Sequence, residues 1–262
     1  MFINNTIFER KFQVKSIFKY ILIGIVQGLT EFLPISSSGH IVLFGSLFEL
    51  DNLLLLSVVA HIGTLFAVIF CYRKKIGELI KHPFNKTNLY LIIATMPTVI
   101  MVLIFNRFLE ANFSTRVLVW GFLISAILLA IADFKKDGNK PINGKNSLYM
   151  GLAQGLALLP GISRSGSTLV CGLLVGVEKQ QALDFSFLMS IPVILASAVY
   201  EGAKLFTSQI TVNWVGIFVV MIVSFIFGIL SIKIMLKLVK QKRLIYFSFY
   251  LILLSLLMLF LV

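Results

Sequence analysis

The sequence predicts an all-α polytopic membrane protein, built as an inverted-topology repeat with two re-entrant helix–loop–helix segments and about six transmembrane helices. Three observations lead to this fold class. The composition is too apolar for a soluble domain, the basic residues collect between long apolar runs, and two Ser/Gly-rich segments far apart in the chain resemble each other. Interrupted segments at matching places in two halves of a membrane protein are typical of inverted repeats.

The composition indicates a membrane protein. Of the 262 residues, 58% are hydrophobic and 13% are charged, whereas soluble domains average about 45–50% and about 25%. Six apolar segments are near the ~20 residues that cross a bilayer; they are residues 53–72, 89–105, 116–134, 184–200, 212–232 and 244–262. We therefore expect residues 1–262 to form a single integral-membrane domain.

The net charge of +12 is distributed unevenly along the chain. Basic residues gather in segments 73–88, 135–146 and 233–243, while the links around 106–115 and 201–211 are close to neutral. This positive-inside pattern predicts that the three basic loops are cytoplasmic and the neutral links external. A nucleic-acid-binding protein would instead collect basic residues and aromatics on one continuous face, so no nucleic-acid partner is expected.

Residues 27–39 resemble residues 154–166 at one constant offset. The matching pairs are Gln27 with Gln154, Ile35 with Ile162, Ser36 with Ser163, Ser38 with Ser165 and Gly39 with Gly166. Three apolar segments follow each copy, which predicts internal repeats over about residues 20–134 and 147–262. An odd number of crossings in each repeat makes the two repeats face opposite ways.

Proline and glycine should break each Ser/Gly-rich segment into half-helices that dip into the membrane and return. Irregular backbone at membrane depth is tolerated only where protein or water covers it, so the two segments should enter from opposite faces and meet near the centre. The basic N-terminus, with Arg10, Lys11, Lys15 and Lys19, departs from the charge pattern. Either it lies along the external membrane surface, or the count of crossings is off by one.

Glu31 and Arg164 are the charged residues that lie within the two Ser/Gly-rich segments. A charge inside a membrane costs several kcal/mol unless it is paired or hydrated, so such residues point to function. If the segments meet, this pair meets and part of the cost is relieved. The alternative is a salt bridge that only pins the two halves together.

Hydroxyl groups and a histidine surround these charges. His40 suits proton transfer or phosphate contact, although a lone histidine is often structural; His61, in an apolar run, is expected to be structural or to line a cavity. Hydroxyls and backbone N–H groups at half-helix starts would form an anion cradle, with these expected substrate-binding residues: Ser36, Ser38, Gly161, Ser163, Ser165 and Thr168. Small residues also allow close helix packing in membranes, which accounts for the glycines but not for the charged neighbours.

From these residues a mechanism can be assembled as a hypothesis. Arg164 and the serine-rich segment ends neutralise charge on a departing phosphoryl group. Either the Ser37 hydroxyl or water attacks phosphorus, and His40 manages protons. Glu31 and Gln27 hold a divalent cation, Mg²⁺ or Ca²⁺, since both prefer oxygen ligands.

The motifs resemble those of a known family. Gln27 and Glu31 fit a [Glu/Gln]-x-x-x-Glu motif that continues through Pro34 to His40, and residues 160–168 fit Pro-Gly-x-Ser-Arg-Ser-x-x-Thr. Over almost the whole chain the sequence resembles the undecaprenyl-diphosphate phosphatases, also called the bacitracin-resistance family. Two departures are Gln27, which is Glu in some members, and His61, where a glutamine is common.

The resemblance implies a multi-pass enzyme of the bacterial inner membrane that hydrolyses undecaprenyl diphosphate to undecaprenyl phosphate and inorganic phosphate. It would recycle the lipid carrier for peptidoglycan and other cell-wall polymers, confer bacitracin resistance and use a divalent cation. The main alternative is an inverted-repeat secondary transporter or flippase for an anionic substrate, which uses the same architecture; a helix-packing scaffold is a weaker one. The oligomeric state is left open between a monomer and a homodimer.

Overall fold

The structure, a computed structural model, describes residues 2–48, 50, 52–111, 114–205 and 213–261. Within these residues the chain forms ten α-helices and no strand. They are α1 (Phe2–Phe32), α2 (Ser37–Leu47), α3 (Leu53–Lys81), α4 (Lys86–Ala111), α5 (Thr115–Phe134), α6 (Gly144–Leu156), α7 (Arg164–Leu174), α8 (Lys179–Leu205), α9 (Trp214–Lys240) and α10 (Ile245–Leu261).

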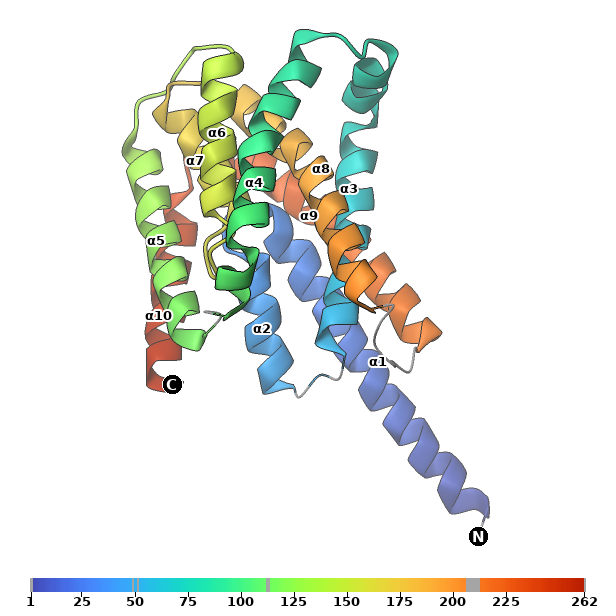
Figure 1. Cartoon of the computed structure of the whole chain (residues 1–262). Coiled ribbons are helices and arrows are strands. Elements are labelled where there is room, and N and C mark those ends of the chain that lie inside the picture. Colours follow the sequence, from blue (N-terminus) through green and yellow to red (C-terminus); the bar gives the residue numbers. More distant parts are fainter. Residues whose placement is uncertain (1, 49, 51, 112–113, 206–212, 262) are drawn as a thin grey trace.

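Five of these helices, α3, α4, α5, α8 and α9, are long and apolar enough to cross a membrane, and α10 is a shorter apolar helix. The expected all-α, multi-pass membrane architecture is therefore confirmed. Figure 1 shows the connections after α3, α5 and α9 at one end of the bundle and both chain termini at the other. All three predicted basic segments thus lie at the same end, and α1 carries the basic N-terminus to the opposite end.

Two of the segments expected to be basic loops are mostly helical, so that expectation was wrong in detail. Residues 73–81 form the last turns of α3, and residues 233–240 form the end of α9. Lysine is a good helix former, and a cation near a helix C-terminus is favoured by the helix dipole. Hydropathy therefore indicates where an apolar span ends but not where the helix ends.

Each Ser/Gly-rich segment folds as a helical hairpin. In the first, α1 and α2 are joined by residues 33–36, and in the second, α6 and α7 are joined by residues 157–163. The two turns lie near the middle of the bundle, with the hairpins approaching from opposite ends (Figure 1). They touch there, because the Ser165 hydroxyl donates to the Leu33 carbonyl over 3.0 Å.

The two Ser/Gly-rich segments are more helical than expected, and two residues expected in the first loop lie in helices instead. Glu31 lies in the last turn of α1 and His40 lies in α2. Turns of this kind satisfy most backbone groups within the helices, which membrane depth requires. Gly161 has a φ of 84° in the second turn, a conformation that only glycine adopts at little cost.

The first hairpin is buried by close helix packing. A Cβ on Gly28 of α1 would lie 2.6 Å from the Phe227 Cβ of α9, so glycine lets the two backbones approach. The Ser231 hydroxyl of α9 donates to the Gly28 carbonyl over 2.8 Å. Behind the hairpin, Phe32 meets Phe187 of α8 edge to face at 5.4 Å between ring centroids.

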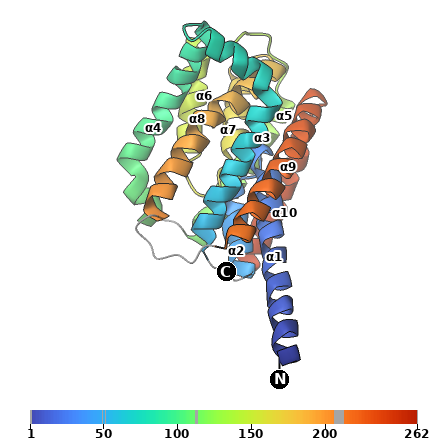
Figure 2. The ribbon, with the colours of Figure 1, turned by 90° about the vertical axis from the view of Figure 1, so that its right-hand side faces the viewer.

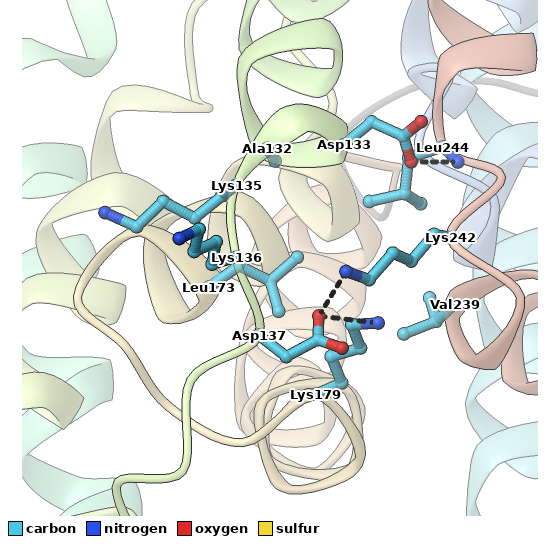
Figure 3. Close-up of a pocket in the computed structure, with 10 residues that line it drawn as sticks. All are labelled: Ala132, Asp133, Lys135, Lys136, Asp137, Leu173, Lys179, Val239, Lys242 and Leu244. Carbon is cyan, nitrogen blue, oxygen red and sulfur yellow. Dashed lines mark hydrogen bonds and ion pairs between the residues drawn. The ribbon is translucent and has the colours of Figure 1, made fainter.

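The α5–α6 link is held by polar contacts at the basic end of the bundle. Asp137 accepts from Lys179 at the start of α8 over 2.7 Å and from Lys242 in the α9–α10 turn over 3.2 Å (Figure 3). Asp133 accepts from the Leu244 backbone N–H over 2.9 Å. These contacts join the link between the two halves to the beginning of α8 and to the α9–α10 turn.

Candidate active site between the two hairpins

Glu31 is the centre of the candidate site. Its side chain is buried, and its Oε2 atom accepts from the Ser37 hydroxyl over 2.7 Å and from the Gln27 amide over 2.9 Å. Its other oxygen, Oε1, accepts from Arg164 Nη2 and forms an ion pair with that side chain. The last turn of α1, the first residue of α2 and the first residue of α7 thus converge on one carboxylate.

The expected meeting of Glu31 and Arg164 is therefore found, and it brings Ser37 and Arg164 together. They lie far apart in the sequence but bind the two oxygens of the same carboxyl group. One phosphate group bound here could contact both side chains, because only the Glu31 carboxyl group separates them.

Arg164 still has an unused donor. Among the described residues, its buried Nη1 atom has no hydrogen-bond partner. A buried donor left unpaired costs about 1–3 kcal/mol, and more when the group is charged. An anionic oxygen would satisfy it, and guanidinium groups suit the oxygens of phosphate.

The two helix starts beside Glu31 differ in capping. Ser163 caps α7 by accepting from the Gly166 N–H over 3.1 Å. Ser36 precedes α2 with φ 66° and ψ 95°, and its side chain makes no capping hydrogen bond. A positive φ in a non-glycine residue is strained, and such strain is typical of functional sites. The first N–H groups of α2 therefore remain available to an anion.

His40 faces away from this cluster. Its Nδ1 atom is 2.8 Å from the Ser36 carbonyl, so Nδ1 carries the proton that is donated to it. Its Nε2 atom is 2.7 Å from the Tyr250 hydroxyl of α10, and the two rings stack at 5.7 Å. Neither ring nitrogen contacts Glu31, Ser37 or Arg164 in the described structure, so proton handling by His40 stays a prediction.

His61 lies closer to the carboxylate than the sequence indicated. Its Nδ1 atom is 2.8 Å from the Ser57 carbonyl, to which it donates, and its Nε2 atom is 3.6 Å from Glu31 Oε2. His61 therefore lines the site from α3, in line with one of its two expected roles. Nothing in the local sequence marks it, because its partner is on another helix.

The remaining expected binding residues divide into three groups. Ser38 is exposed beside Ser36, with 3.4 Å between their hydroxyl oxygens. Ser165 and Thr168 already have protein partners, since Ser165 donates to Leu33 and the Thr168 hydroxyl is 2.6 Å from that of Ser186. Ser163 and Gly161 shape the second turn. The hydroxyls nearest to Glu31 thus come from the first hairpin.

The oxygens of Gln27 and Glu31 fit a divalent cation in part. The buried Gln27 Oε1 atom has no hydrogen-bond partner among the described residues, and it belongs to the side chain whose amide contacts Glu31. A hard cation accepts amide and carboxylate oxygens as ligands. The described residues hold no cluster of three or more His, Cys, Asp or Glu side chains that could bind a metal, so a phosphate group would have to complete the coordination.

The comparison with protein families decides the membership of this chain. A family model described as bacitracin resistance protein BacA matches residues 20–257. The chain belongs to the BacA family.

Curated members of the family cover nearly the whole chain. An undecaprenyl-diphosphatase of Carboxydothermus hydrogenoformans is 40% identical over 243 residues, covering 89% of this chain and 92% of that protein. One from Thermosipho africanus is 40% identical over 252 residues, covering 92% and 98%. An undecaprenyl-diphosphatase 4 of Bacillus thuringiensis is 38% identical over 235 residues, covering 87% and 91%.

As a BacA family member, the chain has a centre suited to anions. It combines a buried guanidinium with a free donor, a hydroxyl held by a carboxylate, and an uncapped helix start. The arrangement can hold a phosphate and bring a hydroxyl to it. Glu31 lies in the last turn of α1, and Ser37 and Arg164 are the first residues of α2 and α7, so the two hairpin turns fix the positions of these groups.

Proposed function

We propose that this chain hydrolyses undecaprenyl diphosphate to undecaprenyl phosphate and inorganic phosphate, and so recycles a lipid carrier. The observation that carries the proposal is the shared carboxylate of Glu31, which holds the Ser37 hydroxyl on one oxygen and Arg164 on the other. The names of the similar proteins support the substrate. Three apolar helices follow each hairpin and provide lipid-facing surface for the polyprenyl tail.

Binding begins with the terminal phosphate of the diphosphate. The Arg164 Nη1 donor and the free N–H groups at the start of α2 bind its oxygens. Charge that develops on the transferring group is stabilised by donors that are already in place. Arg164 and the α2 start come from different hairpins, so the site is complete only across their junction.

Ser37 is the proposed nucleophile. Its Oγ atom forms a bond to the terminal phosphorus, its proton passes to the Glu31 carboxylate, and the bond from phosphorus to the bridging oxygen breaks. Undecaprenyl phosphate leaves with that oxygen. Water then attacks the phosphorus of the phosphoserine, the bond from phosphorus to Ser37 Oγ breaks, and the proton held by Glu31 returns to that oxygen. The protons of the water leave with the inorganic phosphate. A hydroxyl held by a carboxylate has the geometry of an activated nucleophile.

A divalent cation is proposed as the cofactor, held by Gln27 Oε1 and Glu31 together with the substrate. When bound, it neutralises negative charge on the diphosphate. His40 is proposed to act on protons through the residues around Ser36, with Tyr250 fixing the orientation of its ring.

The proposed location is the bacterial plasma membrane, with the basic end of the bundle in the cytoplasm. The hairpins would then be re-entrant from opposite faces. Single cysteines placed in residues 82–85, 135–143 or 241–243 of a cysteine-free chain should resist a membrane-impermeant thiol reagent in whole cells. Labelling of these positions from outside would overturn the orientation.

The decisive experiment is phosphate release from a C55 diphosphate by the purified chain in detergent, with and without EDTA. Release that EDTA abolishes and Mg²⁺ or Ca²⁺ restores is expected. A transporter would produce no phosphate in detergent, where no gradient exists, and that result would refute the proposal. Phosphate release that EDTA does not abolish would refute the proposed divalent cation but not the proposed hydrolysis.

A further inference from the structure

A second cavity lies at the basic end of the bundle, on the outer side of α3. It has a volume of about 690 Å³ and is lined by α3, α8 and α9, and Figure 2 shows α3 between the other two helices. Volumes of about 300–1,000 Å³ are typical of small-molecule sites. Tyr72 in its lining lies three turns of α3 beyond His61, about 16 Å along the helix, so this cavity is separate from the Glu31 site.

The rim of the cavity is strongly cationic. Its lining contains four cations, Arg73, Lys74, Lys75 and Lys233, against one carboxylate, Asp184. Lys74 and Lys233 have no ion-pair partner within the part of the chain that the structure describes. Two lysines that face a cavity without a protein partner attract an anion.

The single carboxylate does not oppose an anion, because its charge is already neutralised. Asp184 Oδ2 lies 2.5 Å from Lys75 Nζ, and Oδ1 accepts from the Tyr72 hydroxyl over 2.7 Å and from the Gln180 amide over 3.0 Å. Arg73 is also held in place, since it donates to the Phe70 carbonyl over 2.9 Å and lies 4.9 Å from the Phe70 ring centre. Lys75 and Asp184 therefore form a neutralised pair in the lining, and Lys74 and Lys233 are the cations left to bind an anion.

Apolar lining residues continue the cavity toward the membrane span. Phe70 of α3, which is half exposed, lies about one turn before Lys74, and Ile229 of α9 lies about one turn before Lys233. Leu236 lies about one turn beyond Lys233, toward the basic end. A ligand that fits must therefore carry an anionic group at one end and hydrocarbon at the other. Basic pockets between transmembrane helices at the cytoplasmic face bind the headgroups of anionic lipids.

We infer that this cavity binds an anionic glycerophospholipid, with its phosphate between Lys74 and Lys233 and an acyl chain along Phe70 and Ile229. The inference does not depend on the proposed catalytic activity. It assigns to the α3–α8–α9 face a lipid ligand that is neither the substrate nor the product of the Glu31 site.

The test uses the purified full chain, titrated with phosphatidylglycerol or phosphatidylcholine and followed by native mass spectrometry. The wild-type chain should bind phosphatidylglycerol more tightly. Each surface cation contributes roughly fivefold to such binding, so K74Q/K233Q should weaken phosphatidylglycerol by up to roughly 30-fold and leave phosphatidylcholine unchanged. The matched control K81Q/K145Q removes two exposed lysines at the same end that do not line the cavity.

Two further arms separate the sources of phosphate. Millimolar inorganic phosphate should not displace phosphatidylglycerol beyond what chloride does at equal ionic strength, and K74Q/K233Q should leave the binding of undecaprenyl phosphate, which goes to the Glu31 site, unchanged. Equal affinity of the two phospholipids, equal losses in both double variants, displacement by inorganic phosphate, or an equal loss of undecaprenyl phosphate binding in K74Q/K233Q would each overturn the inference.

Discussion

The two hairpins share a frame but carry opposite chemistry. At matching positions, the first has Glu31 and Ser37 where the second has Leu158 and Arg164. Both Ser37 and Arg164 are the first residue of a returning helix, and both contact the Glu31 carboxylate. The difference teaches that an inverted repeat can build an asymmetric site, since one half supplies the acid and hydroxyl and the other half supplies the cation.

The hairpins also differ in how their turns are stabilised. Ser163 caps the second returning helix, whereas Ser36 leaves the first returning helix uncapped with a positive φ. A strained, uncapped helix start costs stability and keeps N–H groups free. The second hairpin thus offers the Arg164 Nη1 donor from a capped helix start, and the first offers the free N–H groups of an uncapped one.

The largest effect should come from changing Ser37, because the proposed nucleophile is present in the first hairpin and absent from the second. Ser37→Ala should lower turnover by at least ~1,000-fold, because loss of a covalent nucleophile removes most of the catalysis. Rapid quenched-flow experiments with a diphosphate radiolabelled in its terminal phosphate should trap labelled phosphoserine in the wild-type chain only. Ser46→Ala, on the exposed side of the same helix, is the control. Substantial turnover by Ser37→Ala would indicate that water attacks directly.

Removing either charge of the central pair should be the next largest effect. Glu31→Ala and Arg164→Ala should each lower turnover by at least ~100-fold, the scale of losing one preorganised contact to a developing charge. Phosphate release and a folding assay are measured together. Leu158→Ala, at the position in the second hairpin that matches Glu31, is the control, and its turnover should stay within a few fold of wild type. Near-normal phosphate release from a well-folded Glu31 or Arg164 variant would show that this pair is not the catalytic centre.

Stability should distinguish the two capping serines. Ser163→Ala removes a capping hydrogen bond and should cost about 1 kcal/mol. Ser36→Ala removes no capping bond and should cost less than Ser163→Ala. Thermal unfolding of the two variants in the same detergent makes the comparison direct. Equal losses would show that the two helix starts are stabilised alike.

The smallest effect concerns Asp137 in the α5–α6 link, just before the second hairpin, and depends on pH. The hydrogen bond from Lys179, with a further one from Lys242, holds the pKa of Asp137 below its usual range. Because the folded-state pKa is lowered, this contribution is present above the unfolded-state pKa of about 3.9 and is lost as the pH falls through the folded-state value. The side chain is half exposed, so Asp137→Asn should cost at most about 1 kcal/mol.

The Asp137 variant is compared with the wild-type chain at neutral pH and under acid conditions. The difference in unfolding temperature should vanish in acid, where both chains lack the charge. Lys136→Gln, an exposed neighbour without an ion pair among the described residues, serves as the control. A difference that persists in acid would mean that Asp137 acts through packing instead.

Much of the fold could be predicted because apolar spans and repeated motifs are local signals. The six apolar segments match α3, α4, α5, α8, α9 and α10, and the matching motifs mark the two hairpin turns. The convergence on Glu31 followed from the cost of unpaired membrane charges. The extension of α3 to Lys81 did not, because a solvated helix end carries no hydropathy signal.

The details of the site depended on tertiary contacts. Tyr250 bonds to His40 from 210 residues away, and nothing in the sequence of α10 marks that tyrosine. Nothing in the sequence marks the positive φ of Ser36 either, because glycine is the residue that usually indicates such a conformation. His61 approaches Glu31 because α3 packs beside α1, which periodicity cannot reveal.

The ion pair between Glu31 and Arg164 has a kinetic consequence. A permanently cationic pocket would retain inorganic phosphate, and turnover would then be limited by the slow departure of a tightly held product. Here the guanidinium has a resident partner in the ligand-free chain. Because phosphate binds Nη1 while the Glu31 carboxylate stays on Nη2, the guanidinium keeps one anionic partner when phosphate leaves, and no bare cation is left inside the membrane.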